Sequence, residues 1–311
     1  MRTANCGGSR REFEEMIDFG APPVALESGE RIQRNGSPRM VNFTQERIED
    51  GDVVRRSFEL TVDGERVPAV IWSPADGKGP RPLMLMGHGG SQHKKTPTLA
   101  ARARRYAKAL GYATLAIDAP AHGDRISREE AVAMAREVGA RVRGETPAQT
   151  VDPERFRQML RRSQKAVPEW KAALDAAQSF DFVGADGPVG YWGVSMGTAI
   201  GVPFVASEPR IDAAIFGLAG LREGAADMER AANAITIPLL FVFQWEDAVA
   251  PRETGIALFN AFGSKEKTMH INPGGHMDIP EFERVDWEAF WVRHLGTADA
   301  PVRRREAVAA E

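Results

Sequence analysis

The alternation of short apolar runs with helical stretches constrains the fold of this chain more than any other feature of its sequence. Runs with the character of buried strands are separated by helical stretches of roughly a dozen residues or more. Runs that are apolar on both faces are typical of parallel strands buried between helices. The alternation therefore predicts an α/β fold, with a mostly parallel central sheet flanked by helices on both faces. The predicted strands occupy residues 81–90, 112–118, 187–194, 211–218, 237–243 and 267–272.

Two more strand-like runs precede this alternating part. They cover 54–62 and 66–74, and they flank Asp63-Gly64, a dipeptide that favours a two-residue hairpin turn. Further along, Thr96-Pro97 offers the N-cap and the first position of a helix. We therefore expect an antiparallel hairpin at the start of the sheet, followed by a parallel part.

The lengths of the connections suggest how the chain is divided. Residues 1–39 are rich in glycine, proline and charge, and only 11–19 suggests a short helix, so we expect a poorly structured N-terminal arm. One domain over 40–297 follows, with a helical insertion at 124–165 and a C-terminal tail at 298–311.

The insertion contains the pattern of two amphipathic helices. Ser127 and Glu130 have the spacing of a capping box, and Asp152-Pro153 can begin a second helix. The apolar or small residues of the two faces are Met134, Val138 and Val142 in the first helix and Phe156, Met159, Leu160 and Ser163 in the second. The two helices could simply pack on the domain. We favour a lid, because the insertion leaves from the carboxyl end of a strand, where open α/β sheets place their ligands.

Composition excludes several classes of function. The 311 residues carry a formal net charge of −3, which gives no electrostatic reason to expect a nucleic-acid partner. No stretch approaches the roughly 20 apolar residues that span a bilayer, and the N-terminus lacks the apolar core of a secretory signal. The single cysteine, Cys6, excludes an internal disulfide and any multi-cysteine metal site. A reducing cytoplasm is the expected location, and the oligomeric state is left open.

A serine between two glycines marks the candidate nucleophile. Ser195 lies in YWGVSMGTAIG, after the strand at 187–194 and before a helical stretch. A nucleophile elbow needs a strand, a tight turn and a helix, with very small residues beside the serine. Gly193 and Gly197 provide them, while Pro203 is expected to kink the following helix or to lie near its end.

An acid and then a histidine follow Ser195, in the chain order expected after a nucleophile elbow. Glu246 and Asp247 come directly after the strand at 237–243, and His276 lies on a glycine-rich loop after the strand at 267–272. A serine hydroxyl becomes nucleophilic when a histidine removes its proton and a carboxylate orients that histidine. Parallel strands bring their carboxyl ends to one edge, so the three groups are predicted to meet there.

At this point the sequence resembles the α/β-hydrolase family over about residues 50–297, most closely its serine-esterase and dienelactone-hydrolase-like branch. The motifs that carry the resemblance are MGHGG, GVSMG, WEDAVAP and GGHMD. The resemblance implies an α/β-hydrolase fold and a carboxylic-ester hydrolase acting on a small-molecule ester, with no cofactor and no metal. Dienelactone hydrolases use a cysteine nucleophile where this chain has Ser195, which favours ordinary ester hydrolysis.

Carried over to this sequence, the family pattern gives each site residue a role. Ser195 is the expected nucleophile, His276 the base and Asp247 the orienting acid, with Glu246 as the alternative acid. The expected oxyanion donors are the backbone N–H groups of Gly90 and Met196. A peptidase of similar architecture and a non-catalytic ligand-binding member of the fold are the alternative functions.

The other histidines and tryptophans are expected to be structural. His88 is expected to hydrogen-bond its own loop, His270 to lie inside the last strand, and His294 to belong to the terminal helix. The remaining candidates are His122, which could lie at the rim of the pocket or be structural, and His93, which is too isolated to form a zinc site with His88. Trp192, Trp245 and Met196 flank site residues and could line an apolar acyl pocket, although a core role is equally plausible for Trp192.

Overall fold

The computed structural model describes residues 41–145 and 153–302. In this part of the chain, nine strands form a single sheet in the order β1-β2-β3-β5-β4-β6-β7-β8-β9. The strands are β1 (Phe43–Glu49), β2 (Val53–Val62), β3 (Glu65–Pro74), β4 (Leu83–Gly87), β5 (Ala113–Ile117), β6 (Val189–Gly193), β7 (Ala213–Gly217), β8 (Leu239–Gln244) and β9 (Lys267–Asn272). β1, β2 and β3 are antiparallel to their neighbours, and β4 to β9 pair in parallel. The predicted mostly parallel sheet is confirmed.

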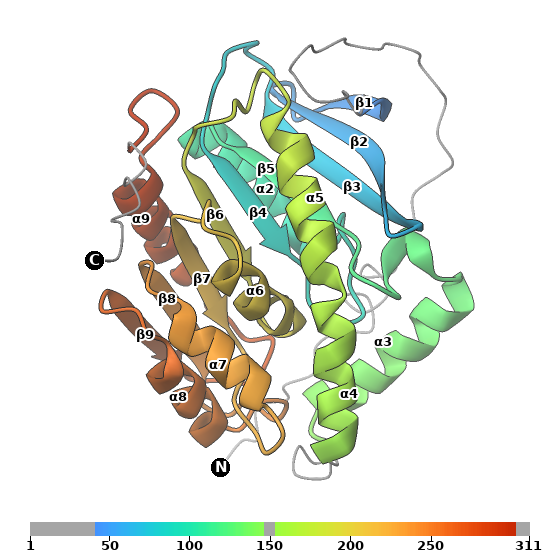
Figure 1. Cartoon of the computed structure of the whole chain (residues 1–311), viewed down its shortest axis with the longest axis vertical. Coiled ribbons are helices and arrows are strands. Elements are labelled where there is room, and N and C mark those ends of the chain that lie inside the picture. The colour runs from blue at the N-terminus through green and yellow to red at the C-terminus, as the bar shows by residue number, and fades with distance from the viewer. Residues whose placement is uncertain (1–40, 146–152, 303–311) are drawn as a thin grey trace, which may run out of the picture.

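Helices cover both faces of the sheet, as the alternating pattern predicts (Figure 1). They are α2 (Pro97–Leu110), α3 (Arg128–Val142), α4 (Pro153–Gln164), α5 (Ala166–Gln178), α6 (Met196–Ala206), α7 (Ala226–Ala234), α8 (Arg252–Ala261) and α9 (Glu283–Leu295), with a 3₁₀ turn, η1, at Gly123–Arg125. Helix α6 continues through Pro203, which lies inside it. The predicted arm at 1–39 and residues 303–311 of the predicted tail lie outside the described residues.

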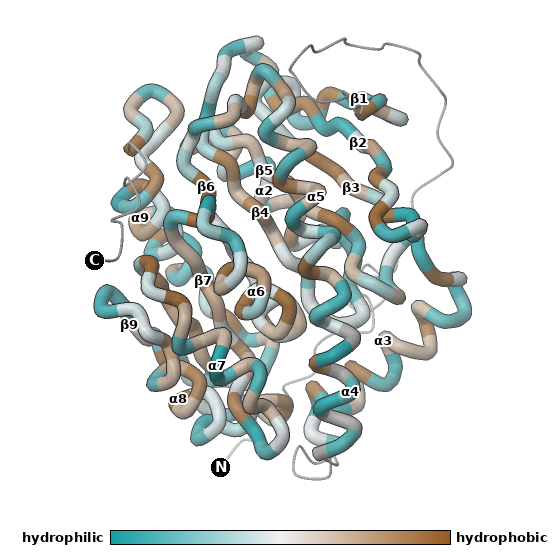
Figure 2. The backbone as a smooth tube through the Cα atoms, in the orientation of Figure 1, coloured by the Kyte–Doolittle hydropathy of each residue, from teal (hydrophilic) through white to brown (hydrophobic). Residues whose placement is uncertain are grey.

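Each face of the sheet has its own hydrophobic core. One core includes Trp170 of α5, Phe204 of α6 and Leu258 of α8, and the other includes Leu99 of α2 and Trp291 of α9. The strand tubes are correspondingly hydrophobic in the centre of the molecule (Figure 2). The strands β4 to β8 therefore need apolar side chains on both faces, which explains their continuous apolar runs.

The hairpin between β2 and β3 turns where the sequence predicts it, but the strand before it was missed. Asp63 and Gly64 both have positive φ, 50° and 83°, as a type I′ turn requires. β1 was not predicted, although Asp50-Gly51 repeats the same signal with φ values of 52° and 81°. β1 is an edge strand with mostly polar, partly exposed side chains, so hydrophobicity alone gave no indication of it.

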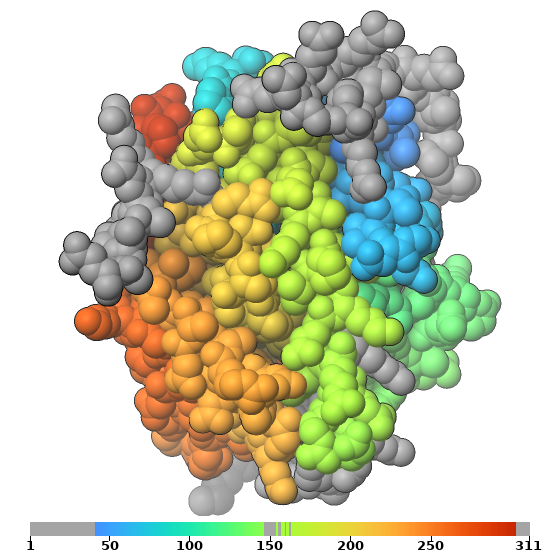
Figure 3. Space-filling model, viewed as in Figure 1, coloured from blue at the N-terminus to red at the C-terminus, as the bar shows by residue number. Residues whose placement is uncertain are grey.

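The insertion forms the two helices α3 and α4. Residues 146–152, which connect these helices, lie outside the described residues. The predicted capping box is present, because Ser127 Oγ accepts from the Glu130 N–H and the Glu130 carboxylate accepts from the Ser127 N–H. α4 and α5 form one long ridge over this face of the molecule (Figure 3). No helix of the described residues is long and apolar enough to cross a membrane.

Candidate active site

The carboxyl ends of the parallel strands position the predicted site residues at one edge of the sheet. Gly87 at the end of β4 is in register with Gly193 at the end of β6, and Gln244 of β8 is in register with Asn272 of β9. Chain segments leaving these four positions carry Gly90, Ser195, Asp247 and His276. The topology thus delivers residues that are far apart in the sequence to the same edge.

Ser195 has the strained backbone of a nucleophile elbow. Its φ of 57° and ψ of −118° lie in a region that residues with a Cβ rarely adopt. The Ser195 N–H donates to the Gly217 carbonyl of β7 at 2.9 Å, and helix α6 begins at the next residue. The strand, turn and helix that the motif predicts are all present.

The glycines beside Ser195 are required by close backbone approaches. A Cβ on Gly193 would lie 2.8 Å from the Gly197 carbonyl oxygen, and a Cβ on Gly197 would lie 2.6 Å from the carbonyl oxygen of Gly87. Both distances are shorter than real Cβ contacts, and the opposing atoms are backbone, which cannot rotate away. The Gly-x-Ser-x-Gly pattern therefore has a steric cause in this fold.

Two polar side chains that were not predicted from the sequence stabilise the turn at Ser195. Thr198 is fully buried on α6, and its Oγ1 lies 2.9 Å from the Gly193 carbonyl, 2.7 Å from the Gly217 carbonyl and 2.9 Å from the Gly217 N–H, from which it accepts. The Tyr191 hydroxyl of β6 donates to the Gly197 carbonyl at 2.8 Å. Neither residue type is unusual in a helix or strand, so the sequence carried no signal for these contacts.

A continuous hydrogen-bonded chain joins serine, histidine and aspartate. His276 Nε2 lies 2.9 Å from Ser195 Oγ, and His276 Nδ1 lies 2.8 Å from Asp247 Oδ2. The Asp247 side chain is fully buried, and its other oxygen, Oδ1, accepts from the N–H groups of Val249 and Ala250 at 2.8 and 2.9 Å. These bonds fix the carboxylate, which in turn fixes the imidazole ring.

Glu246 contacts the His276 loop at a different point. Its exposed carboxylate accepts from the Gly274 N–H, and its own N–H donates to the Gly274 carbonyl at 3.0 Å. Asp278 accepts from the Gly275 N–H at 2.7 Å on the other side of the loop. Glu246 thus holds the loop that carries the histidine, and Asp247 is the acid that contacts the imidazole.

The two expected oxyanion donors have free amides at the edge of the site. Among the residues that the structure describes, the N–H groups of Gly90 and Met196 donate to no acceptor. Met196 is the first residue of α6, where helix geometry leaves the amide without an intrahelical acceptor. Both amides are therefore available to an oxygen atom of a ligand.

His88 secures the loop that carries Gly90. Its Nε2 accepts from the Ala119 N–H at 3.0 Å, which leaves Nδ1 to donate to the Gly89 carbonyl at 2.8 Å. Burial, reinforced by neighbouring His122, lowers the pKa of His88 to about 3. The ring is therefore neutral at physiological pH, and it ties the Gly90 loop to the loop after β5.

A buried ion pair fixes the far end of the same loop. Lys94 Nζ lies 2.6 Å from Asp118 Oδ2, and Asp118 also accepts from the Lys94 N–H and the Asp124 N–H at 2.9 Å each. Lys94 Nζ also contacts the Asp124 carboxylate. This network joins the Gly90 loop to the first residues of the insertion.

Three other residues singled out in the sequence have surroundings of their own. Trp192 is buried in the core, where its ring contacts both Arg102 and the Trp287 ring. Trp245 is 48% exposed beneath Arg252, and the buried His122 bonds the Pro120 carbonyl. Trp192 therefore has the core role and is not counted among the residues that could line the acyl pocket.

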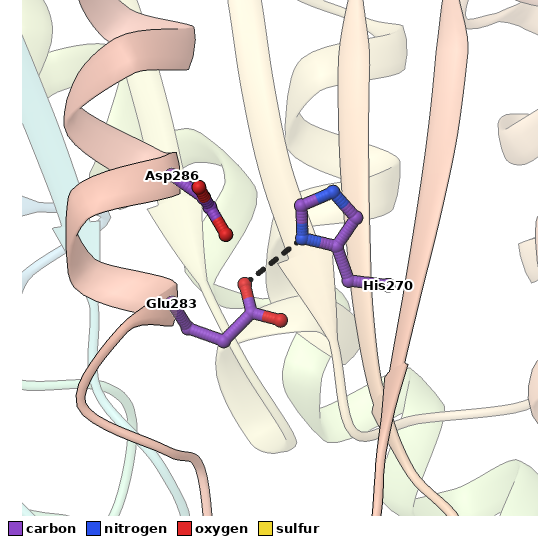
Figure 4. A group of neighbouring side chains, drawn as sticks. All are labelled: His270, Glu283 and Asp286. Carbon is purple, nitrogen blue, oxygen red and sulfur yellow. Dashed lines mark hydrogen bonds and ion pairs between the residues drawn. The ribbon is translucent and has the colours of Figure 1, made fainter.

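One group of described side chains has the composition of a metal site, and it lies outside the candidate active site. The possible ligand atoms of His270, Glu283 and Asp286 all lie within 4.8 Å of one another (Figure 4). His270 Nδ1 is already 3.0 Å from Glu283 Oε2, and Asn272 donates to the other oxygen of this buried carboxylate at 2.7 Å. The group is thus an internally satisfied clamp between β9 and α9.

Comparison with known proteins identifies related esterases among solved structures. A cold-adapted esterase from an Arctic intertidal metagenomic library is 32% identical, with a TM-score of 0.64 over 80% of this chain and 97% of its own. An acetyl xylan esterase from Paenibacillus sp. R4 is 17% identical, with a TM-score of 0.59 over 82% of this chain and 88% of its own.

A third structure has the same fold. A putative dienelactone hydrolase from Klebsiella pneumoniae subsp. pneumoniae is 16% identical, with a TM-score of 0.57 over 77% of this chain and 97% of its own. A scan of protein-family models and a search of curated proteins found no match. The relationship therefore rests on the solved structures, and above all on the cold-adapted esterase.

Proposed function

The chain belongs to the esterases of the α/β-hydrolase family, and we propose that it hydrolyses a carboxylic ester through an acyl-enzyme formed on Ser195. The observation that carries the mechanism is the contact chain Ser195 Oγ–His276 Nε2–Asp247, with distances of 2.9 and 2.8 Å. The substrate is a small-molecule ester, as the esterase relatives imply.

In the first half of the reaction, the ester acylates the serine. Ser195 Oγ attacks the carbonyl carbon while His276 Nε2 takes the hydroxyl proton, and Asp247 stabilises the imidazolium that forms. The carbonyl oxygen becomes an oxyanion and accepts from the Gly90 and Met196 N–H groups. When the intermediate collapses, the bond to the alcohol oxygen breaks, and His276 gives its proton to that oxygen.

In the second half, water releases the acid. His276, neutral again, takes a proton from a water molecule, and the hydroxide attacks the acyl carbon at the position vacated by the alcohol. The second oxyanion uses the same two amides. Its collapse breaks the bond to Ser195 Oγ, which recovers its proton from His276, and the carboxylic acid leaves.

Turnover of p-nitrophenyl acetate by matched serine variants tests this proposal. Ser195→Ala removes the nucleophile and should lower kcat by roughly 10⁴-fold or more, with little effect on the thermal midpoint. Ser207→Ala is the control, because Ser207 follows α6 and its hydroxyl donates to the Phe204 carbonyl. Near-normal turnover by Ser195→Ala would remove the basis of the mechanism.

The two alternative functions predict different results in the same assay. A non-catalytic ligand-binding protein would not turn over p-nitrophenyl acetate at all. A peptidase would cleave aminoacyl amides at rates comparable with the corresponding esters. The proposal predicts ester turnover that exceeds amide turnover, with both abolished by Ser195→Ala.

A further inference from the structure

Helix α3 of the insertion lies against the site at two points. A Cβ built on Gly90, in the loop after β4, would lie 3.8 Å from Val138 Cγ2. A Cβ built on Gly144, just past the end of α3, would lie 3.7 Å from the Cβ of Ala248, the residue after Asp247. Since β6 and β7 lie between β4 and β8 in the sheet, the segment from Val138 to Gly144 spans the edge where Ser195 is presented.

The α3 face near these contacts carries an apolar stripe that the protein covers only in part. Met134, Val138 and Val142 follow one another at four-residue spacing, and all three are partly exposed. The neighbouring positions Ala135 and Gly139 are buried, so α3 packs through small residues and leaves the larger ones beside them accessible. An apolar ligand group placed against the stripe would cover it and gain hydrophobic contact.

Helix α4 has a different environment. Leu160 is only 6% exposed and belongs to the core that includes α5 and α6, and the helix packs on α6. The side chains of Phe156 and Met159 lie outside the described residues. The described part of α4 therefore matches the packing alternative, and α3 is the part of the insertion that borders the site.

The proposed reaction determines which part of the ester faces α3. Of the four bonds of the tetrahedral carbon, one goes to Ser195 Oγ, one to the oxyanion beside Gly90 and Met196, and one to the alcohol oxygen, which must reach His276 Nε2. The fourth bond leads to the acyl chain. The acyl chain is thus the substituent that these three contacts leave free, and Val138 of α3 borders the Gly90 loop beside it.

We propose that Val138 limits the length of the acyl group and makes the enzyme selective for esters of short-chain carboxylic acids. This inference rests on the proposed function. Because a Cβ on Gly90 would already be at van der Waals distance from Val138 Cγ2, the Val138 side chain limits the space between α3 and the Gly90 loop. A short apolar acyl group fits beneath the stripe, and a longer chain meets the Val138 side chain.

Substitution at Val138 tests the proposal through the ratio of kcat/KM for p-nitrophenyl hexanoate to that for the acetate. Val138→Ala removes two methyl groups and should raise this ratio by about tenfold, whereas Val138→Phe should lower it. Val167→Ala makes the same change on α5, where Val167 packs against the core. The control should lower the thermal midpoint and leave the ratio unchanged.

The outcomes separate this inference from the proposed function. If the hexanoate-to-acetate ratio of kcat/KM is unchanged in both Val138→Ala and Val138→Phe, the role of Val138 is overturned. The same conclusion follows if Val138→Ala, like the control, lowers only the thermal midpoint. If Val138→Phe does not fold, Val138→Leu provides the same comparison with a smaller side chain. A wild-type protein that hydrolyses neither ester would contradict the proposed function itself.

Discussion

At the scale of single residues, the two neighbouring carboxylates after β8 have separate tasks. Asp247 contacts His276 Nδ1 and is fully buried, whereas Glu246 is exposed and bonds the backbone of Gly274. The residues alone placed both at the right strand end without distinguishing them, because adjacent residues differ only in the direction of their side chains, and the family pattern favoured Asp247 over Glu246. That direction follows from the turn at Asp247, whose Oδ1 accepts from the next amides.

Replacing Asp247 and Glu246 in turn with the corresponding amide should lower kcat to very different extents. Asp247→Asn should lower kcat by about 10⁴-fold, because an amide cannot hold the imidazole in the tautomer that accepts the serine proton. Its thermal midpoint should change little, since the Asn carbonyl can still accept from Val249 and Ala250. Glu246→Gln should retain most of the activity. The opposite ranking of kcat would assign the acid to Glu246.

Thr198 allows a prediction with a matched control. Thr198→Val removes the hydroxyl that bonds Gly193 and Gly217, so it should cost roughly 1–3 kcal/mol of unfolding free energy and lower kcat/KM by displacing the elbow. Thr114 on β5 is equally buried, but its hydroxyl has no hydrogen-bond partner among the described residues. Thr114→Val should therefore be neutral or stabilising in urea unfolding. Equal losses in both variants would remove the special role of Thr198.

At the scale of elements, the pair His270–Glu283 joins the edge strand β9 to α9, the helix after the His276 loop. The hydrogen bond that His270 donates to the Glu283 carboxylate raises the pKa of His270 above its usual value. Burial raises the pKa of Glu283, but the hydrogen bonds from His270 and Asn272 outweigh it and lower that pKa overall. The clamp is thus strongest when the imidazole is protonated and the carboxylate is ionised.

The stability that this clamp provides should depend on pH in a defined direction. Because the folded-state pKa of His270 is raised, its contribution is complete below about pH 6.5 and is lost as pH rises through the folded-state value. The contribution of Glu283 is complete above about pH 4.3 and is lost on acidification. Urea unfolding should show a larger deficit for His270→Gln at pH 5.5 than at pH 8.5. A deficit independent of pH would contradict the charged clamp.

The elements themselves were predictable to different degrees. The strands β4 to β8 were predictable from the sequence, because burial on both faces demands unbroken apolar runs. β1 pairs through its backbone while its side chains stay mostly polar, so only Asp50-Gly51 marked it. The capping box at Ser127 fixed where α3 begins, but the position of Val138 against Gly90 is a tertiary contact between residues distant in sequence. The spacing of apolar residues along the sequence does not indicate which distant segments lie together in the fold.

At the scale of the whole molecule, a buried ion pair connects the start of the insertion to the helical layer over the sheet. Arg125 Nη1 of η1 lies 2.8 Å from Glu169 Oε2 of α5, with both side chains at least nine-tenths buried. Burial raises the pKa of Glu169, although Arg125 partly counteracts this effect. Arg125 is the cation that pairs with Glu169 among the described residues, so its removal would leave the ionised carboxylate buried without that compensation.

Removal of the arginine should destabilise the protein most at high pH. A carboxyl group with a raised folded-state pKa loses stability as pH rises through its unfolded-state value, and Arg125→Met enlarges that loss. We expect a cost of roughly 3–5 kcal/mol at pH 8 and a smaller one at pH 5, where Glu169 can be protonated. Arg230→Met, at the exposed pair with Asp227, should have little effect at either pH. Equal costs at both pH values for Arg125→Met would contradict this account.

The central claim is that Ser195 carries the acyl group, and covalent labelling tests it most directly. A fluorophosphonate reacts with a serine only when a base activates it and oxyanion donors bind the phosphonyl oxygen. Intact mass measurement followed by peptide mapping should find one label per chain, located on Ser195, with no label in Ser195→Ala and almost none in His276→Ala. A label on another residue, or labelling that persists in Ser195→Ala, would contradict the account.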